Sequence, residues 1–177
     1  MMGDDVLFTG RRFRVVGLSE PCADGSTRRR EVIEHPGSVV VVPLVSPTEV
    51  CLVEVERVAV RRTLLELPAG TLDREESLVA AAGRELTEET GYRAGRLEPV
   101  GSFWMSPGIL RERMHLFLAT HLTAGPQALE PGERITPRVV SWQEAVAMCL
   151  DGRIDDAKTV AGILLVDARR RAVVSPS

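Results

Sequence analysis

Residues 70–92 read GTLDREESLVAAAGRELTEETGY, the most informative part of the sequence. Apolar residues at helical spacing predict a helix over 77–90, and Gly91 suits the left-handed position that ends a helix. On that helix Glu85, Glu88 and Glu89 stand three and four residues apart, so their carboxylates share one face. The like charges repel, and a hard divalent cation such as Mg²⁺ or Mn²⁺ would offset the repulsion. Taken alone, these three glutamates fit an acidic helix face exposed to solvent better than a metal site. The residues around them must therefore distinguish the two interpretations.

That spacing is the pattern G-x5-E-x7-R-E-U-x-E-E-x-G-U, where U is apolar or aromatic, and every fixed position is matched from Gly70 to Tyr92. The pattern resembles the Nudix box, the signature of a family that hydrolyses nucleoside diphosphates linked to another group. The resemblance implies that Glu85 and Glu89, with Glu88 in support, hold divalent metals. The backbone carbonyl of Ala69, beside the flexible Gly70, is a further candidate ligand. Arg84 is expected to pair with Glu76 and tie the loop to the helix.

The remainder of the chain alternates strand and helix signals. A continuous β-branched run at 39–45 predicts a strand buried on both faces, and the Asp24-Gly25 turn predicts an N-terminal hairpin. Because hairpin signals argue against a uniform parallel sheet, we expect an α/β sandwich with a mixed β-sheet. The resemblance implies that this is a Nudix-type α/β/α sandwich, plus the N-terminal β-hairpin. Further predicted strands are 6–18, 29–34, 50–60, 99–104, 114–122 and 138–141, and further predicted helices are 142–151 and 156–170. The expected regions are the hairpin at 1–36, the hydrolase domain at 37–171 and a tail at 172–177.

Four flanking segments narrow the resemblance. Leu65–Gly70, Ser106-Pro107-Gly108, Asp151–Thr159 and Arg30–Gly37 are similar to the ADP-ribose pyrophosphatase subgroup, so the likeness extends from about residue 28 to residue 166. It implies Mg²⁺-dependent or Mn²⁺-dependent hydrolysis of ADP-ribose to AMP and ribose 5-phosphate, with two or more ions per site. The subgroup usually forms homodimers through its N-terminal strands, so the hairpin is the expected dimer contact.

The resemblance also suggests roles outside the box. Glu112 stands where the subgroup has a carboxylate in a loop. It is expected to act as general base or to position the attacking water. A solvent-exposed loop glutamate without a catalytic role fits this position equally well. Arg57 and Arg30 match arginines that approach the diphosphate or the nucleoside, although Arg30 lies in a basic run of a kind that usually faces solvent. Glu31 is a weak candidate for recognising the adenine amino group. In a homodimer Arg30 and Glu31 would act in the neighbouring subunit's site.

Arg111 departs from the subgroup, which has a small polar or acidic residue at this place. It could bind a terminal phosphate of the substrate or face solvent. Because of this difference, other substrates are alternatives to ADP-ribose: another nucleotide sugar, FAD, NADH or a diadenosine polyphosphate. A non-catalytic nucleotide sensor is a further alternative, against which the full set of Glu85, Glu88, Glu89 and Glu112 argues.

Composition excludes several other classes. The 177 residues contain 22 Lys plus Arg against 25 Asp plus Glu, a net charge of −3, so no basic excess favours nucleic acid or an anionic membrane as partner. Apolar runs fall short of the roughly 20 residues that a membrane helix needs. Residues 1–5 lack the basic start of a secretory signal, so we expect a cytoplasmic protein. Cys22, Cys51 and Cys149 lack metal-ligand spacing.

Overall fold

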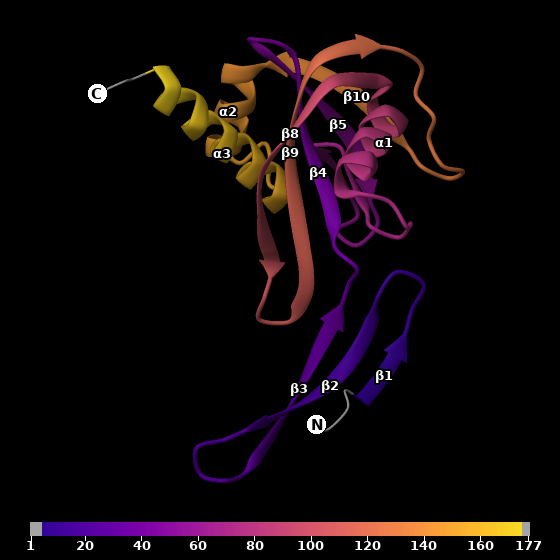
Figure 1. Ribbon diagram of the computed structural model, residues 1–177, viewed down its shortest axis with the longest axis vertical. Coiled ribbons are helices and arrows are strands. Elements are labelled where there is room, and N and C mark those ends of the chain that lie inside the picture. The colour runs from indigo at the N-terminus through magenta and orange to yellow at the C-terminus, as the bar shows by residue number, and fades with distance from the viewer. Residues whose placement is uncertain (1–4, 175–177) are drawn as a thin grey trace.

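A mixed β-sheet forms the centre of the molecule, with one helix on one face and two on the other (Figure 1). The computed structural model describes residues 5–174. Within them the strands are β1 (Asp5–Thr9), β2 (Arg14–Pro21), β3 (Thr27–Glu34), β4 (Ser38–Ser46), β5 (Glu49–Arg57), β6 (Arg62–Glu66), β7 (Ala69–Thr71), β8 (Tyr92–Ser106), β9 (Leu110–Ala124) and β10 (Ile135–Ser141). The helices are α1 (Leu78–Thr90), α2 (Trp142–Asp151) and α3 (Ala157–Val174). The expected α/β sandwich with a mixed sheet is confirmed.

Strand β4 divides the core. It runs parallel to β9 and antiparallel to β5 and β7, and Val39 to Val42 are completely buried. Because alternate side chains of a strand point to opposite faces, Val39 and Val41 pack with α1, while Val40 and Val42 pack with α2 and α3. The uninterrupted run of β-branched residues therefore fits a strand covered on both sides, as its sequence predicts.

Helix α1 begins and ends where its sequence predicts. The Ser77 hydroxyl accepts a hydrogen bond from the backbone N–H of Ala80 at 3.2 Å, and Gly91 takes the left-handed conformation with φ 75°. Ala81 and Ala82 are fully buried against the sheet, and their small size lets the helix approach it closely. This packing fixes which face of α1 is left over for the glutamates.

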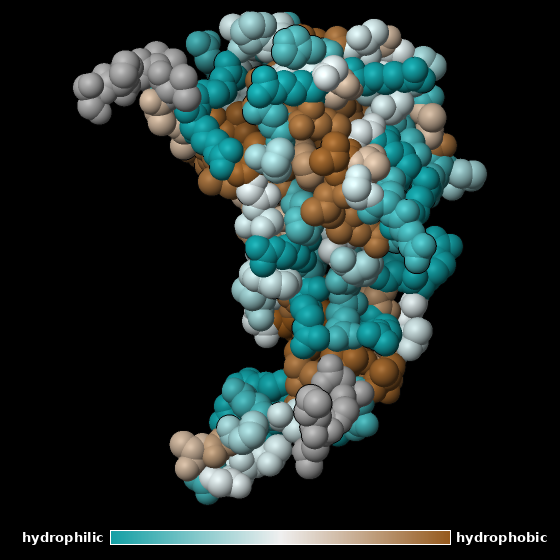
Figure 2. All heavy atoms as spheres, in the orientation of Figure 1, coloured by the Kyte–Doolittle hydropathy of each residue, from teal (hydrophilic) through white to brown (hydrophobic). Residues whose placement is uncertain are grey.

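The N-terminal part is a three-stranded sheet that projects from the rest of the molecule (Figure 1). The β2–β3 hairpin and its turn at Gly25 are confirmed, but the prediction of one extended segment over 6–18 is wrong, since a turn at residues 10–13 separates β1 from β2. The projecting sheet joins the main sheet through a short parallel pairing of β3 with β9. On β1 the side chains of Val6, Leu7 and Phe8 are about half exposed, and Figure 2 shows hydrophobic residues gathered on the projecting sheet.

Some boundaries differ from those expected. The strand predicted over 50–60 ends at Arg57, because residues 58–61 form an exposed turn with Arg61 at φ 55°. Strands β8 and β9 have 15 residues each and form one long hairpin. Strands β6 and β7 are too short to leave a periodic signal in the sequence. Residues 1–4 of the predicted N-terminal region and 175–177 of the predicted tail lie outside the described residues. None of the helices described is long and apolar enough to cross a membrane.

Candidate active site

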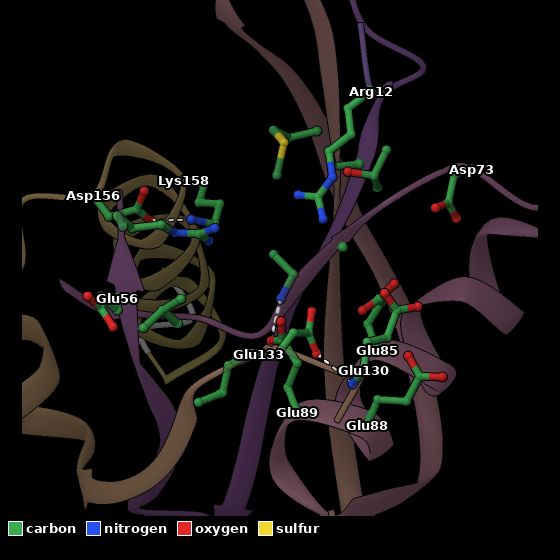
Figure 3. A pocket seen from close by; sticks show the side chains of 18 of the residues that line it. Arg12, Glu56, Asp73, Glu85, Glu88, Glu89, Glu130, Glu133, Asp156 and Lys158 are labelled. Carbon is green, nitrogen blue, oxygen red and sulfur yellow. Dashed lines mark hydrogen bonds and ion pairs between the residues drawn. The ribbon is translucent and has the colours of Figure 1, made fainter. Parts of the chain in front are cut away.

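A cavity of about 750 Å³ opens over the glutamate face of α1 (Figure 3). Its walls come from β7, α1, β9, the end of β5, the start of α3, the turn between β1 and β2, and the loop of residues 125–134 that precedes β10. Carboxylates outnumber cations around it. The carboxylates are Glu56, Asp73, Glu85, Glu88, Glu89, Glu112, Glu130, Glu133 and Asp156, and the cations are Arg12, Arg57, Arg84, Arg134 and Lys158.

Arg84 holds two of the three box glutamates. One guanidinium nitrogen, Nη1, donates to Glu85 at 2.6 Å and to Glu88 at 2.9 Å, and Nη2 donates to Glu76 at 2.7 Å. The expected pair between Arg84 and Glu76 is therefore present and ties the loop of residues 72–77 to α1. Among residues 5–172, no three His, Cys, Asp or Glu side chains converge closely enough to form a metal site.

Glu89, the third of these glutamates, contacts the backbone of β7 instead. It is 7% exposed and accepts a hydrogen bond from the backbone N–H of Ala69 at 3.0 Å. Burial raises the pKa of Glu89 to about 8; the N–H of Ala69 opposes this rise, and the charges of Glu85 and Glu133 add to it. Burial also raises the pKa of Glu85, which Arg84 partly counters. The pKa values of both carboxyl groups are therefore raised mainly because the groups are buried, and the neighbouring carboxylates add to the effect.

Gly70 leaves room for the carboxylate of Glu85. A Cβ atom at this position would lie 1.9 Å from the carboxyl carbon of Glu85, so only glycine leaves room for that carboxylate beside β7. Carboxylate oxygens and a backbone carbonyl form the all-oxygen set that Mg²⁺ and Mn²⁺ prefer. The residues present therefore fit a divalent cation held between β7 and α1.

Glu112 lies across the cavity on β9. Its Oε1 accepts a hydrogen bond from the Ser38 hydroxyl at 2.9 Å and stands 3.4 Å from Nδ1 of His35. The backbone N–H of Gly37 also points at His35 Nδ1, at 3.2 Å. Ser38 thus orients Glu112 from the neighbouring strand, and the cavity brings Glu112 together with the box glutamates.

The comparison with known families agrees with this geometry. Residues 34–163 match the family model of the NUDIX domain. The chain belongs to the Nudix family. The Nudix box found in the sequence is thus the glutamate face of α1 and the loop before it.

Similar proteins extend the comparison. A methanol dehydrogenase activator of Bacillus methanolicus is 33% identical over 159 residues, which cover 89% of this chain and 86% of that protein. An ADP-ribose pyrophosphatase of Bacillus subtilis (strain 168) is 31% identical over 159 residues, with the same coverage. A solved structure described as an ADP compounds hydrolase superposes with a TM-score of 0.82 at 23% identity, covering 97% of this chain and 93% of that one. This last likeness supports the Nudix fold.

Arg57 lines the Nudix cavity but is already paired. Its guanidinium donates two hydrogen bonds of 2.7 Å to Glu66, which is 1% exposed. Lys158 also donates to Glu66 and lies 3.0 Å from Asp156. Burial alone would raise the pKa of Glu66, but Arg57 and Lys158 lower it below its ordinary value. Arg57 is therefore held rigidly on the wall of the cavity opposite α1.

The other three residues predicted to bind substrate do not line this cavity. Arg30 and Glu31 are exposed on β3 of the projecting sheet, where Arg30 pairs with Glu20 at 3.2 Å. Arg111 donates to Glu34 at 2.6 Å and lines a second cavity beside the first.

The structure adds Glu130 and Glu133, which sequence reasoning missed. Their loop is fixed to the end of α1: the amide of Gln127 donates to the carbonyl of Glu89 at 2.6 Å, and the N–H of Ala128 donates to that of Glu88 at 3.1 Å. In Figure 3, Glu85, Glu89 and Glu133 gather at one end of the cavity. No sequence motif covers residues 125–134. The only available signal was the presence of two glutamates in a long loop, because functional residues often lie on loops.

Proposed function

We propose that this Nudix protein hydrolyses the diphosphate of ADP-ribose to AMP and ribose 5-phosphate with Mg²⁺ or Mn²⁺. The observation that carries the proposal is the shared cavity: Glu85, Glu88 and Glu89 line it from α1, and Glu112 lines it from β9. The Bacillus subtilis relative, an ADP-ribose pyrophosphatase, supports the choice of substrate.

The metal ligands proposed are Glu85, Glu89 and the carbonyl of Ala69, with Glu88 in support, for two or more ions. Bound divalent ions would neutralise the diphosphate and make water a better nucleophile. Arg84 keeps Glu85 and Glu88 on the cavity side of α1, so the carboxylates are placed before any ion arrives. The N–H of Ala69 does the same for Glu89.

Glu112 is the proposed general base, which would take the proton from the attacking water or position that water. Ser38 holds its Oε1, which leaves Oε2 free of protein hydrogen bonds within the described residues. Glu133 is the second candidate, because its loop brings it near Glu85 and Glu89, whose pKa values it helps to raise. Replacing each by glutamine separates them. Loss of the base lowers kcat and removes its decline toward acidic pH, whereas loss of a metal ligand raises the Mg²⁺ concentration required.

Phosphate contacts are proposed for Arg57, whose planar guanidinium suits a phosphate oxygen. Glu66 occupies two of its donors and leaves the third nitrogen, Nη1, for substrate. Arg111 faces the second cavity and remains a candidate for a terminal phosphate.

A homodimer is proposed for the whole protein, with residues 37–171 as the hydrolase domain and residues 1–36 as the dimer contact. Two observations support it: apolar side chains on β1 are half exposed on a projecting sheet, and Arg30 and Glu31 lie outside their own chain's cavity. Light scattering after gel filtration measures the mass directly. The three cysteines carry no disulfide, as is usual for the cytoplasm, the proposed location.

The deciding experiment incubates the purified protein with ADP-ribose and Mg²⁺ and resolves AMP by chromatography. AMP formation that EDTA and Glu89→Gln both abolish supports the proposal. Glu98→Gln is the matched control, because Glu98 lies on β8, pairs with Arg96 and does not line the cavity. If the folded wild type gives no AMP, ADP-ribose is excluded, and nucleotide sugars, FAD, NADH and diadenosine polyphosphates are tested in turn.

A further inference from the structure

A second cavity, of about 520 Å³, adjoins the catalytic one. Arg12 and His35 line both, so the two spaces share a wall. Their charges are opposite in sign. Carboxylates dominate the first cavity, whereas the second is lined by four arginines and one carboxylate: Arg11, Arg12, Arg14, Arg111 and Glu34.

The turn between β1 and β2 carries two of these arginines. The backbone N–H of Gly10 donates to the carbonyl of Phe13 at 2.9 Å, which closes the turn with Arg11 and Arg12 at its tip. The rings of Phe8 and Phe13 pack with their centroids 6.0 Å apart where the strands meet the turn. Both arginines are therefore presented on an ordered turn.

In the second cavity, ion pairs of Glu34 connect three strands; we call this group of Arg14, Glu34 and Arg111 the clamp. Glu34 on β3 accepts from Arg14 on β2 at 2.7 Å and from Arg111 on β9 at 2.6 Å. One carboxylate thus serves two guanidinium groups and leaves an excess of positive charge. Glu34 is also only 18% exposed, so the clamp fixes the position of the arginine turn over the catalytic domain.

Arg12 differs from the other cations of the catalytic cavity. Arg57 and Lys158 pair with Glu66, Arg84 pairs with the box glutamates, and Arg134 lies 3.4 Å from Glu56. Within residues 5–172 no carboxylate comes within ion-pair distance of Arg12. In Figure 3 its guanidinium points into the cavity from the end opposite the glutamates. It is thus the cation of this cavity left for an anion that is not part of the protein.

We propose that the second cavity, with Arg12 at its mouth, is a subsite for a phosphate group that the substrate carries in addition to its scissile diphosphate. The subsite rests on the proposed function. The scissile diphosphate belongs beside the glutamates, where metal ions compensate its charge, so it leaves the arginine cavity unused. A guanidinium can donate two parallel hydrogen bonds to a further phosphate, and an adjoining cavity of this size accepts a phosphorylated sugar.

The kinetic test compares ADP-ribose with two substrates that carry further phosphate. In ADP-ribose 2′-phosphate the extra group lies on the nucleoside ribose, and in diadenosine tetraphosphate it lies within the polyphosphate chain. The wild type is expected to show at least one of these with kcat/KM about tenfold above that of ADP-ribose, the size of one charge-assisted hydrogen bond. Arg12→Ala should reduce that ratio to about one, Arg12→Lys should give an intermediate ratio, and Arg93→Ala, an exposed arginine outside both cavities, should leave it unchanged.

A binding test without metal separates failure of the subsite from failure of the proposed function. In EDTA the glutamate cavity repels anions, so inorganic phosphate or ribose 5-phosphate should bind at the arginine cavity, as measured by calorimetry. Binding that Arg12→Ala weakens about tenfold and Arg93→Ala preserves supports the subsite even if ADP-ribose proves a poor substrate. Absence of binding to the folded wild type, binding that ignores Arg12→Ala, or a kcat/KM ratio at or below one for both phosphorylated substrates overturns it.

Discussion

Gly70 and Glu85 are in such close contact that a single methyl group between them would overlap the carboxylate. The Cβ of an alanine at position 70 would stand 1.9 Å from the carboxyl carbon of Glu85. Glycine at position 70 therefore leaves room for the carboxylate of a proposed metal ligand, and this relation couples β7 to the chemistry of the site.

Gly70→Ala is expected to displace Glu85 and lower kcat with ADP-ribose about a hundredfold, because a displacement of about 1 Å at a reacting centre has that effect. The melting temperature should change little, since Glu85 can turn toward solvent. Gly101→Ala on β8 is the control, as a Cβ there would meet no atom within 4 Å. Full activity of Gly70→Ala would show that Glu85 does not hold the metal.

Stability in the absence of metal should fall with rising pH. Burial raises the pKa of Glu89 from its ordinary 4.5 to about 8, so the folded protein binds this proton more tightly than the unfolded chain. The resulting stability is complete below pH 4.5 and is lost as pH rises to about 8. Mg²⁺ replaces the proton, and the increase in melting temperature that it causes should grow from pH 5.5 to pH 8.5.

Thermal melts in EDTA and in Mg²⁺ across this pH range measure the effect. Glu89→Gln should remove most of the pH dependence in EDTA, because the amide does not titrate. A metal-induced shift of equal size at every pH would mean that Glu89 is already ionised in the metal-free protein.

The glutamate face of α1 could be predicted because its determinants are local. Ser77, Gly91 and the spacing of Glu85, Glu88 and Glu89 lie within fifteen consecutive residues, so helical periodicity alone places the carboxylates on one side. The two-sided burial of β4 follows equally from its own residues. Both features depend on a single helix or strand, and the periodicity of that element determines on which face each side chain lies.

Arg12 and Glu133 could not be predicted because their positions depend on pairings between distant segments. Glu133 reaches the cavity through the hydrogen bonds of Gln127 and Ala128 to α1, 38 and 40 residues away in sequence. Arg12 reaches it because the parallel pairing of β3 with β9 sets the projecting sheet beside the catalytic domain. Residues 10–13 also contain one glycine among charged and aromatic residues, a poor turn signal, and the turn that carries Arg12 was therefore missed.

The buried charge network beneath the cavity should matter for stability. Glu66→Ala leaves Arg57 and Lys158 without their shared carboxylate, although Asp156 stays near Lys158, so we expect a loss of about 3 kcal/mol in the free energy of unfolding. Urea denaturation measures it. Glu54→Ala removes an exposed pair with Arg138 and should cost less than about 1 kcal/mol. Equal losses for the two variants would mean that burial does not strengthen the network.

Arg30 and Glu31 can be assigned to one subunit or the other by mixing inactive variants. Both lie on the projecting sheet outside the cavity of their own chain, so in the proposed homodimer they serve the partner's site. Arg30→Ala/Glu31→Ala and Glu89→Gln should each be nearly inactive alone. In a mixed dimer one site combines an intact cavity with an intact partner strand. Free exchange of equal amounts should then restore about a quarter of the wild-type activity, since half of the dimers are mixed and one site in each is complete.

The matched control mixes Glu85→Gln with Glu89→Gln. Both changes lie in the cavity of the same chain, so every site in the mixture carries one of them, and no recovery is expected. If the Arg30 and Glu31 variant stays inactive after verified subunit exchange with Glu89→Gln, the two residues act within their own chain. That outcome would require the projecting sheet to fold toward its own cavity when substrate binds. If the variant is fully active alone, neither residue contacts the substrate, and recognition must come from side chains that line the cavity itself, with Arg57 and Arg12 the cations placed to provide it.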